Sequence, residues 1–341
     1  MHTRITLGQR WVAIAAVTVL AALAMLASPA VAHADGGAVP TENTLPGTPD
    51  WYMPTAPTGS AADQFAGRVT SIDGWIWPLS AAPGDRMDLH VGTAPGLRYR
   101  VEVYRLGWYD GDGARLMACL PSCSGDQAGV TQPLPPAPDA STGMVRPEWS
   151  TTDSLTVPAG WPSGTYMAAL RITSGPAEGM VRRLPFVIRS ATPNRSKVVV
   201  IVPVNTWAAY NGWGGKSLYD NHSVDGVRAS QVSFEKPWAE GVEIQNWRYD
   251  EYPMVRFLER EGLDVSYVSD WDVSSRPGIL AGHRVVMTMG HGEYWSKEHR
   301  DALEAARDGG QNLAFMGANL GYWQVRYADG GRTLIGYKSD A

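Results

Sequence analysis

The strongest constraint on the fold is an uninterrupted apolar run of β-branched residues at the start of the second half, Lys197-Val198-Val199-Val200-Ile201-Val202. Such runs are typical of strands buried on both faces, as in a parallel sheet, because a strand with one solvent-exposed face alternates polar and apolar residues. Further strands are expected at 263–268, 284–289 and 312–316, with helices at 253–261 and 296–308. This order predicts that residues 195–341 form a doubly wound, mostly parallel α/β sheet.

The strand expected at 284–289 continues into Gly290-His291-Gly292-Glu293-Tyr294-Trp295. Ligands of open α/β sheets bind beyond the carboxyl ends of the strands, and glycine lets the backbone turn sharply there. His291 and Glu293 therefore place an imidazole and a carboxylate where metal binding or proton transfer takes place. The competing interpretation is a polar loop whose His and Glu cap the following helix.

The first half of the chain has a different pattern of polar and apolar residues. Residues 62–190 contain short segments of alternating polar and apolar residues, separated by turns such as Ala82-Pro83-Gly84-Asp85. This pattern predicts an immunoglobulin-like β-sandwich. Residues 35–61, rich in Pro, Gly, Ala and Thr, are expected to be a linker. The net charge of −5 and the absence of a basic block argue against nucleic acid as a partner.

The first 34 residues have the order of a secretory signal peptide. Arg4 and Arg10 precede an apolar stretch at 11–27, and Ala32-His33-Ala34 fits the cleavage rule, so the mature chain is expected to begin near Asp35. The protein is then secreted or extracytoplasmic, without a membrane span after cleavage. The alternative is an uncleaved anchor.

The two cysteines are Cys119 and Cys123. In an exported protein they are expected to form a small disulfide loop rather than half of a metal site, because no second Cys or His pair lies nearby.

Several motifs of the second half occur together in one order, and with them residues 195–338 resemble the large (beta) subunit of N,N-dimethylformamidase, in its glutamine-amidotransferase-like domain. The motifs are the segment 203–219, Glu251-Tyr252-Pro253, Leu258-Glu259-Arg260-Glu261-Gly262, the segment 290–295, and Gly317-Ala318-Asn319-Leu320-Gly321. The resemblance implies a class I glutamine-amidotransferase-like fold. The first half resembles the domain that precedes it in exported homologues, notably at Tyr104-Arg105-Leu106-Gly107-Trp108-Tyr109.

The chain lacks the nucleophilic cysteine that the amidotransferase fold would lead one to expect. Amidotransferases carry a nucleophilic Cys in a G-x-C-x-G elbow, whereas this chain has Asn319 at that position and its only cysteines lie in the other half. Acyl transfer through a thiolate at this site is therefore excluded.

What the resemblance implies instead is a mononuclear ferric iron (Fe3+) held by two tyrosinates and a glutamate. Tyr210 matches the first tyrosine and Glu293 the carboxylate; Tyr252 is preferred as the second tyrosine, with Tyr249 as the alternative. Hard anionic oxygen ligands suit a ferric ion. His291 would transfer protons and Asn319 would donate a hydrogen bond to the developing oxyanion.

The resemblance thus implies an exported metal-dependent amide hydrolase that acts on small amides or formamides, with an oligomer or a small subunit as partner. The alternative is a non-catalytic binding or envelope-associated protein that keeps the fold. Because the family's domain continues past the position of Ala341, the resemblance also implies that this α/β domain is truncated at its C-terminus.

Overall fold

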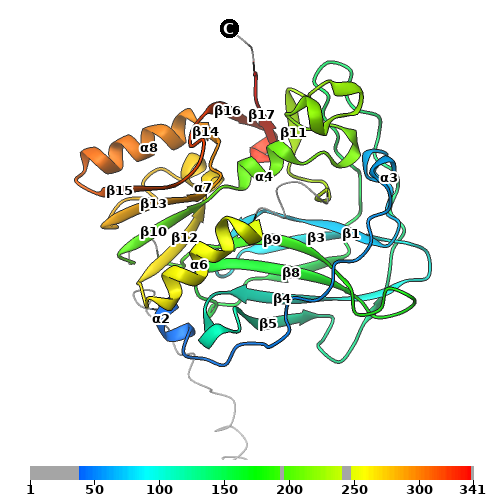
Figure 1. Cartoon of the computed structure of the whole chain (residues 1–341), viewed down its shortest axis with the longest axis horizontal. Helices are drawn as coiled ribbons and strands as arrows, with labels where there is room; N and C mark the ends of the chain where they lie inside the picture. Colours follow the sequence, from blue (N-terminus) through cyan, green and yellow to red (C-terminus); the bar gives the residue numbers. More distant parts are fainter. Residues whose placement is uncertain (1–37, 193–195, 240–246, 339–341) are drawn as a thin grey trace, which may run out of the picture. The chain divides into compact units, whose positions relative to one another are not determined.

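Four β-sheets dominate the computed structural model, which describes residues 38–192, 196–239 and 247–338 (Figure 1). The first half supplies two of them. One is antiparallel, in the order β1 (Ile72–Trp77), β3 (Arg86–Thr93), β7 (Asp153–Thr156). The other has the order β2 (Ser80–Ala81), β9 (Val181–Ile188), β8 (Gly164–Ile172), β4 (Arg98–Leu106), β5 (Ala114–Leu120), and β6 (Gln127–Ala128) also pairs with β4. Strand β1 contacts β8 and β9, so the two sheets pack together in a way consistent with a β-sandwich.

The segment that precedes β1 is packed against this half. It contains two short helices, α2 (Ala38–Glu42) and α3 (Ala61–Phe65), and it buries Val39, Trp51 and Ala56 in the main apolar core. The proposed signal peptide, residues 1–34, lies outside the described residues.

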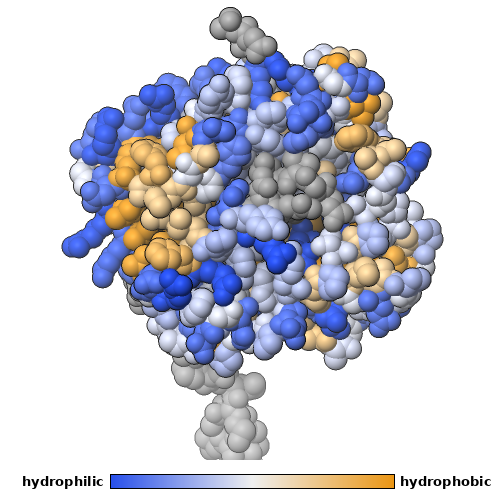
Figure 2. Space-filling model, viewed as in Figure 1, coloured by the Kyte–Doolittle hydropathy of each residue, from blue (hydrophilic) through white to orange (hydrophobic). Residues whose placement is uncertain are grey.

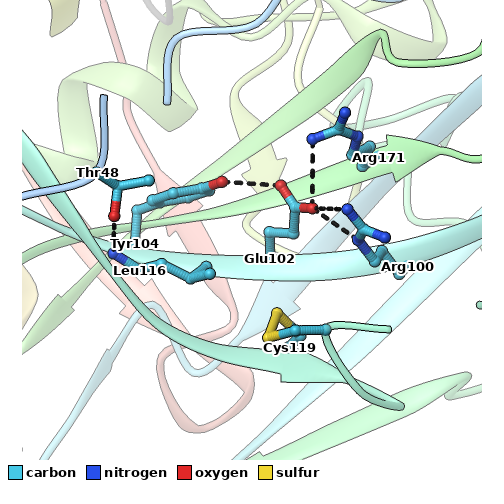
Figure 3. Close-up of a disulfide and its surroundings, with 8 residues drawn as sticks. Thr48, Arg100, Glu102, Tyr104, Leu116, Cys119 and Arg171 are labelled. Atoms are coloured by element: carbon cyan, nitrogen blue, oxygen red, sulfur yellow. Dashed lines mark hydrogen bonds and ion pairs between the residues drawn. A yellow bond between two sulfur atoms is a disulfide. The ribbon is translucent and has the colours of Figure 1, made fainter. Parts of the chain in front are cut away.

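The predicted disulfide is present between Cys119 and Cys123, at the end of β5 (Figure 3). Cys119 lies opposite Glu102 in the β4–β5 ladder. The buried carboxylate of Glu102 accepts hydrogen bonds from Arg100 Nε at 2.6 Å and Tyr104 Oη at 2.8 Å, and Arg171 lies at 3.5 Å. Its charge is thus matched by two guanidinium groups.

The apolar run of the second half forms the centre of a parallel sheet. Its strands have the order β12 (Val265–Ser269), β10 (Val198–Val202), β13 (Val285–Gly290), β15 (Asn312–Gly317). Along β10, Val199 and Ile201 pack in the same apolar cluster as Val273 of α7 (Asp270–Ser275) and Leu303 of α8 (Lys297–Asp308). The alternate residues Val200 and Val202 join the main core, to which α6 (Glu251–Arg260) contributes Val255 and Leu258. Burial of both faces explains the absence of polar residues from the run.

The predicted fold class, a doubly wound parallel α/β sheet, is wrong. Most described strands belong to antiparallel or mixed sheets, and the fourth sheet is mixed: β11 (Gln231–Ser233), β17 (Thr333–Ile335), β16 (Trp323–Ala328), β14 (Tyr294–Ser296). After β10 the chain forms α4 (Val204–Tyr210) and then a long excursion of 3-10 turns that ends in β11. After β15 it enters β16 and β17 rather than another helix. Both departures interrupt the strand–helix alternation that a doubly wound sheet needs.

A fully buried ion pair joins the two halves. Arg105 of β4 donates from both terminal nitrogens to Glu259 of α6, at 2.9 Å each. The same carboxylate accepts from Asn43 Nδ2 at 2.6 Å and from Tyr267 Oη at 3.0 Å. With four donors around one carboxylate, this contact fixes α6 against the first half.

Candidate functional site

Glu293 is the centre of the candidate site. It lies between β13 and β14 and is almost completely buried. Tyr210 Oη donates to its Oε2 at 2.8 Å, and Tyr219 Oη donates to its Oε1 at 2.5 Å. The chain reaches this position through Gly290, whose φ is +63° and whose α-carbon faces Glu251; an added Cβ would lie 2.4 Å from Glu251 Oε1. Only glycine satisfies both constraints.

Helix α4 holds Glu293 at two points. Thr206 and Tyr210 lie one turn apart on the same face of the helix. Thr206 Oγ1 accepts from the backbone N–H of Glu293 at 3.0 Å, while Tyr210 reaches the carboxylate. Helix α4 has no side-chain cap of its own, and the buried carboxylate of Asp270 accepts from the N–H of Asn205 at its first turn instead. Burial raises the pKa of Asp270 well above its ordinary value, although the N–H donors oppose this.

Tyr219 is presented by the loop that follows α4, and a buried lysine organises this loop. Lys236 Nζ donates to the carbonyl oxygens of Asn211 at 2.9 Å, Trp213 at 3.2 Å and Lys216 at 2.9 Å. Burial lowers the pKa of Lys236 to about 7. The three carbonyl oxygens act in the other direction, because their dipoles favour the charged ammonium. In this loop the centroid of the Tyr219 ring lies at 4.1 Å from the centroid of the Tyr210 ring.

His291 and Asn319 lie at the same edge because β13 and β15 are parallel neighbours, with Gly290 opposite Gly317. His291 Nε2 is 3.4 Å from Glu293 Oε2 and 3.3 Å from Asn319 Nδ2. Both contacts use the same ring nitrogen, so His291 can donate to the carboxylate or accept from the amide, but it cannot do both at once. Asn319 has a φ of +50°, a left-handed conformation that asparagine tolerates.

The structure places Tyr252 elsewhere. Its hydroxyl donates to the carbonyl oxygen of Gly113 at 3.1 Å, and its ring packs between Trp51 and Trp247. None of these described contacts involves Glu293. The alternative, Tyr249, is 70% exposed. The structure therefore brings together Tyr210, Glu293, His291 and Asn319, but not Tyr252, and no described contact joins Tyr249 to these residues.

Sequence reasoning missed Tyr219 as the second tyrosine at the carboxylate. A signal was present, because Tyr219 ends the same motif, 203–219, that contains Tyr210. It lies beyond a glycine-rich segment that allows a sharp turn, and the N–H of Leu218 donates to the carbonyl oxygen of Ala209 at 2.9 Å, so the chain returns to the end of α4.

The electrostatics of the site keep both phenols protonated when no metal ion is bound. Burial raises the pKa of Tyr210 and of Tyr219 well above the ordinary value, and their hydrogen bonds to Glu293 raise it further. Lys338 Nζ lies 3.1 Å from the centroid of the Tyr219 ring. Burial lowers the pKa of Lys338 to about 8, although Glu293 opposes this change. One positive charge therefore already lies beside the oxygen cluster.

The cluster is chemically an oxygen donor set. The oxygens of two phenols lie beside the two oxygens of one carboxylate. A hard cation such as ferric iron prefers oxygen ligands of this kind. The described residues contain no group of three or more His, Cys, Asp or Glu side chains that could hold a metal. A metal at this edge would therefore depend on the tyrosines.

The chain was also compared with known proteins. A family model described as N,N-dimethylformamidase beta subunit-like, C-terminal, matches residues 100–341. No curated protein matches the chain. The family description names a subunit, which is consistent with a partner chain. No helix in the described ranges has the length and hydropathy needed to cross a membrane.

Proposed function

We propose that this chain, which belongs to the N,N-dimethylformamidase beta subunit-like family, hydrolyses small amides or formamides at a mononuclear iron. Tyr210, Tyr219 and Glu293 are the proposed ligands. The observation that carries the proposal is the convergence of both tyrosine hydroxyls on one buried carboxylate, at 2.8 and 2.5 Å. In this assignment Tyr219 takes the position for which the sequence favoured Tyr252.

The donor set fits a ferric ion. Three anionic ligands would balance its charge, and the positive charge of the neighbouring Lys338 would oppose the binding of the cation. Loading must release the two phenol protons, because both hydroxyls are protonated in its absence. Iron affinity is therefore expected to rise with pH.

Hydrolysis of an amide breaks the C–N bond, forms a C–O bond with water, and needs a proton on the departing nitrogen. A bound ferric ion supplies Lewis acidity to the amide carbonyl or to the attacking water. His291 accepts the proton from water and returns it to the amine. Asn319 orients the imidazole through its amide, 3.3 Å away, and donates to the oxyanion when that contact is released.

The test is to express the chain with iron, measure bound metal and record the visible spectrum. A ferric tyrosinate gives a visible charge-transfer band, and N,N-dimethylformamide or formamide should be hydrolysed. Glu293→Gln should lose both iron and activity, whereas Glu298→Gln, at an exposed position of α8, should keep them. A colourless, metal-free and inactive wild-type protein would favour the binding or envelope-associated role instead.

Export is a separate part of the proposal. Its basis is the order of charged, apolar and small residues in positions 1–34. The intact mass of secreted protein should correspond to a chain that begins near Asp35. A mass that includes residues 1–34 would contradict cleavage.

A further inference from the structure

A pocket of about 370 Å³ lies beside β12, and none of its described lining residues belongs to the candidate site. Its walls come from three parts of the chain: Arg189 directly after β9, Ser266 and Val268 of β12, and the loop after α7 with Arg276 and Ile279. Strand β12 is the edge of the parallel sheet opposite to β15. The pocket is therefore separate from the apolar area on the left of Figure 2, where Figure 1 places β15.

One buried carboxylate anchors both arginines of the pocket. The side chain of Asp272 is fully buried, and its Oδ2 accepts from the backbone N–H of Ser269 at 2.9 Å and from the hydroxyl of Ser269 at 2.7 Å. Its Oδ1 accepts from Arg276 Nε at 3.3 Å and lies 2.9 Å from Arg189 Nε. Two guanidinium groups thus share a single carboxylate oxygen.

Arg189 is short of hydrogen-bond acceptors. A guanidinium group has five N–H donors, but among the described residues the side chain of Arg189 makes one hydrogen bond, from Nη2 to Asp85 Oδ2 at 3.0 Å. Its Nε is buried and has no acceptor with hydrogen-bond geometry, although Asp272 is close. Burial lowers the pKa of Arg189, and the charge of Arg276 lowers it as well, against the opposing effects of Asp272 and Asp85. An anion in the pocket would stabilise this guanidinium group.

Arg276 is the accessible arginine of the pair. Its side chain is 45% exposed, and its terminal nitrogens have no acceptor within the described part of the chain. The planar fork of a guanidinium group matches the two oxygens of a carboxylate. His283, the third titratable side chain of the pocket, is uncharged at neutral pH because burial lowers its pKa below 6.5.

The charge and the walls of the pocket indicate which anion fits. Asp272 is buried behind the two arginines, whereas the side chain of Asp85 is 49% exposed and solvent screens its charge. The pocket is therefore short of roughly one negative charge, which a carboxylate supplies and a phosphate exceeds. Val268, Pro277 and Ile279 form an apolar wall against which a short carbon chain can pack.

We propose that this pocket binds a short aliphatic carboxylate. The oxygens of the ligand accept from the terminal nitrogens of Arg276 and from the unpaired donors of Arg189, and its carbon chain lies against Val268 and Ile279. Arg189 belongs to the first half of the chain and Arg276 to the second. The bound carboxylate therefore joins the two halves at a place apart from the buried ion pair of β4 and α6.

The test is the thermal unfolding midpoint of the purified chain, measured against the concentration of propionate, with chloride at equal ionic strength as the reference. A ligand that binds only the native state raises the midpoint with its concentration, and this gives the apparent affinity. Arg276→Gln should weaken that affinity by about tenfold to a hundredfold, because charge-assisted hydrogen bonds are lost. Arg300→Gln is the matched control, since both arginines pair with a carboxylate four residues away, and it should bind propionate as the wild type does.

Further measurements test the class of ligand and the location of the site. Formate lacks the carbon chain and inorganic phosphate has the wrong charge, so both should bind the wild type more weakly than propionate. These comparisons need no variant, and they also decide the matter if Arg276→Gln fails to fold. Glu293→Gln should keep propionate binding, because Glu293 does not line the pocket. An unchanged midpoint in the wild type, equal affinity in Arg276→Gln, a preference for phosphate or formate, or loss of binding in Glu293→Gln would each overturn the proposal.

Discussion

The structure predicts that Lys236→Met destabilises the protein and disrupts the position of Tyr219. Methionine keeps the length and apolar stem of lysine but removes the ammonium group. The carbonyl oxygens of Asn211, Trp213 and Lys216 then lose the donor that they share, and no other described donor reaches them.

The magnitude follows from two opposing contributions. A buried acceptor that loses its partner costs about 1–3 kcal/mol, so three of them cost about 3–9 kcal/mol. Removing a buried charge offsets part of this: the pKa of Lys236 falls from 10.5 to about 7, and each unit corresponds to about 1.4 kcal/mol. The two contributions leave an expected net loss in the free energy of unfolding of about 1 kcal/mol, and at most about 4 kcal/mol.

The assay has two readouts. Urea unfolding of the metal-free protein measures stability, with Lys297→Met on exposed α8 as the control, for which a change within about 0.5 kcal/mol is expected. Iron titration measures the affinity of the site for iron. Lys236→Met should bind iron more weakly because the loop no longer holds Tyr219 beside Glu293. No measurable loss of stability together with unchanged iron affinity would refute the reasoning.

Three further outcomes are expected. Tyr219→Phe should abolish iron binding and the visible band, while Tyr252→Phe should keep both; the reverse result would restore the ligand set that the sequence favoured. His291→Ala should lower the rate of amide hydrolysis by about two to four powers of ten with iron retained, and a fully active variant would contradict its role in proton transfer. Burial lowers the pKa of His299 to about 3 from 6.5, so below pH 6.5 the unfolded chain binds a proton there that the native chain does not. The free energy of unfolding should therefore fall by about 2–3 kcal/mol between pH 6.5 and 4.5 from this group. His299→Leu should remove this part of the acid sensitivity, and equal pH dependence in both proteins would argue against it.

Local patterns in the sequence predicted single elements well. The apolar run at 197–202 is β10, and Ser296 caps α8, accepting from the N–H of His299 at 3.1 Å. These elements depend on neighbouring residues, which the sequence displays directly. Sheet membership does not: β16 and β17 are neighbours in the chain, but β17 also pairs with the distant β11, with Ser233 opposite Thr333, and β14 pairs with β16 across α8 and β15.

In the site, too, some features could be predicted from local sequence and others depend on contacts between distant residues. His291 and Glu293 follow a strand and Asn319 follows its parallel neighbour, so their proximity could be predicted from strand order. The choice between tyrosines depended on how α6 is oriented. That orientation comes from the contacts of Tyr252 with Gly113 and of Glu259 with Arg105, both of which connect residues more than a hundred positions apart.

The Arg105–Glu259 pair has a consequence for how this protein can vary. Replacing either residue alone leaves the other charge in a dry interior, which typically costs about 3–5 kcal/mol, whereas replacing both with apolar residues can be nearly neutral. Relatives should therefore carry both residues or neither, although the two positions lie in different halves of the chain. A chimera that takes its first half from a relative without the arginine should fail to fold until position 259 is changed with it. The two halves are expected to be inherited as a unit and to tolerate exchange poorly.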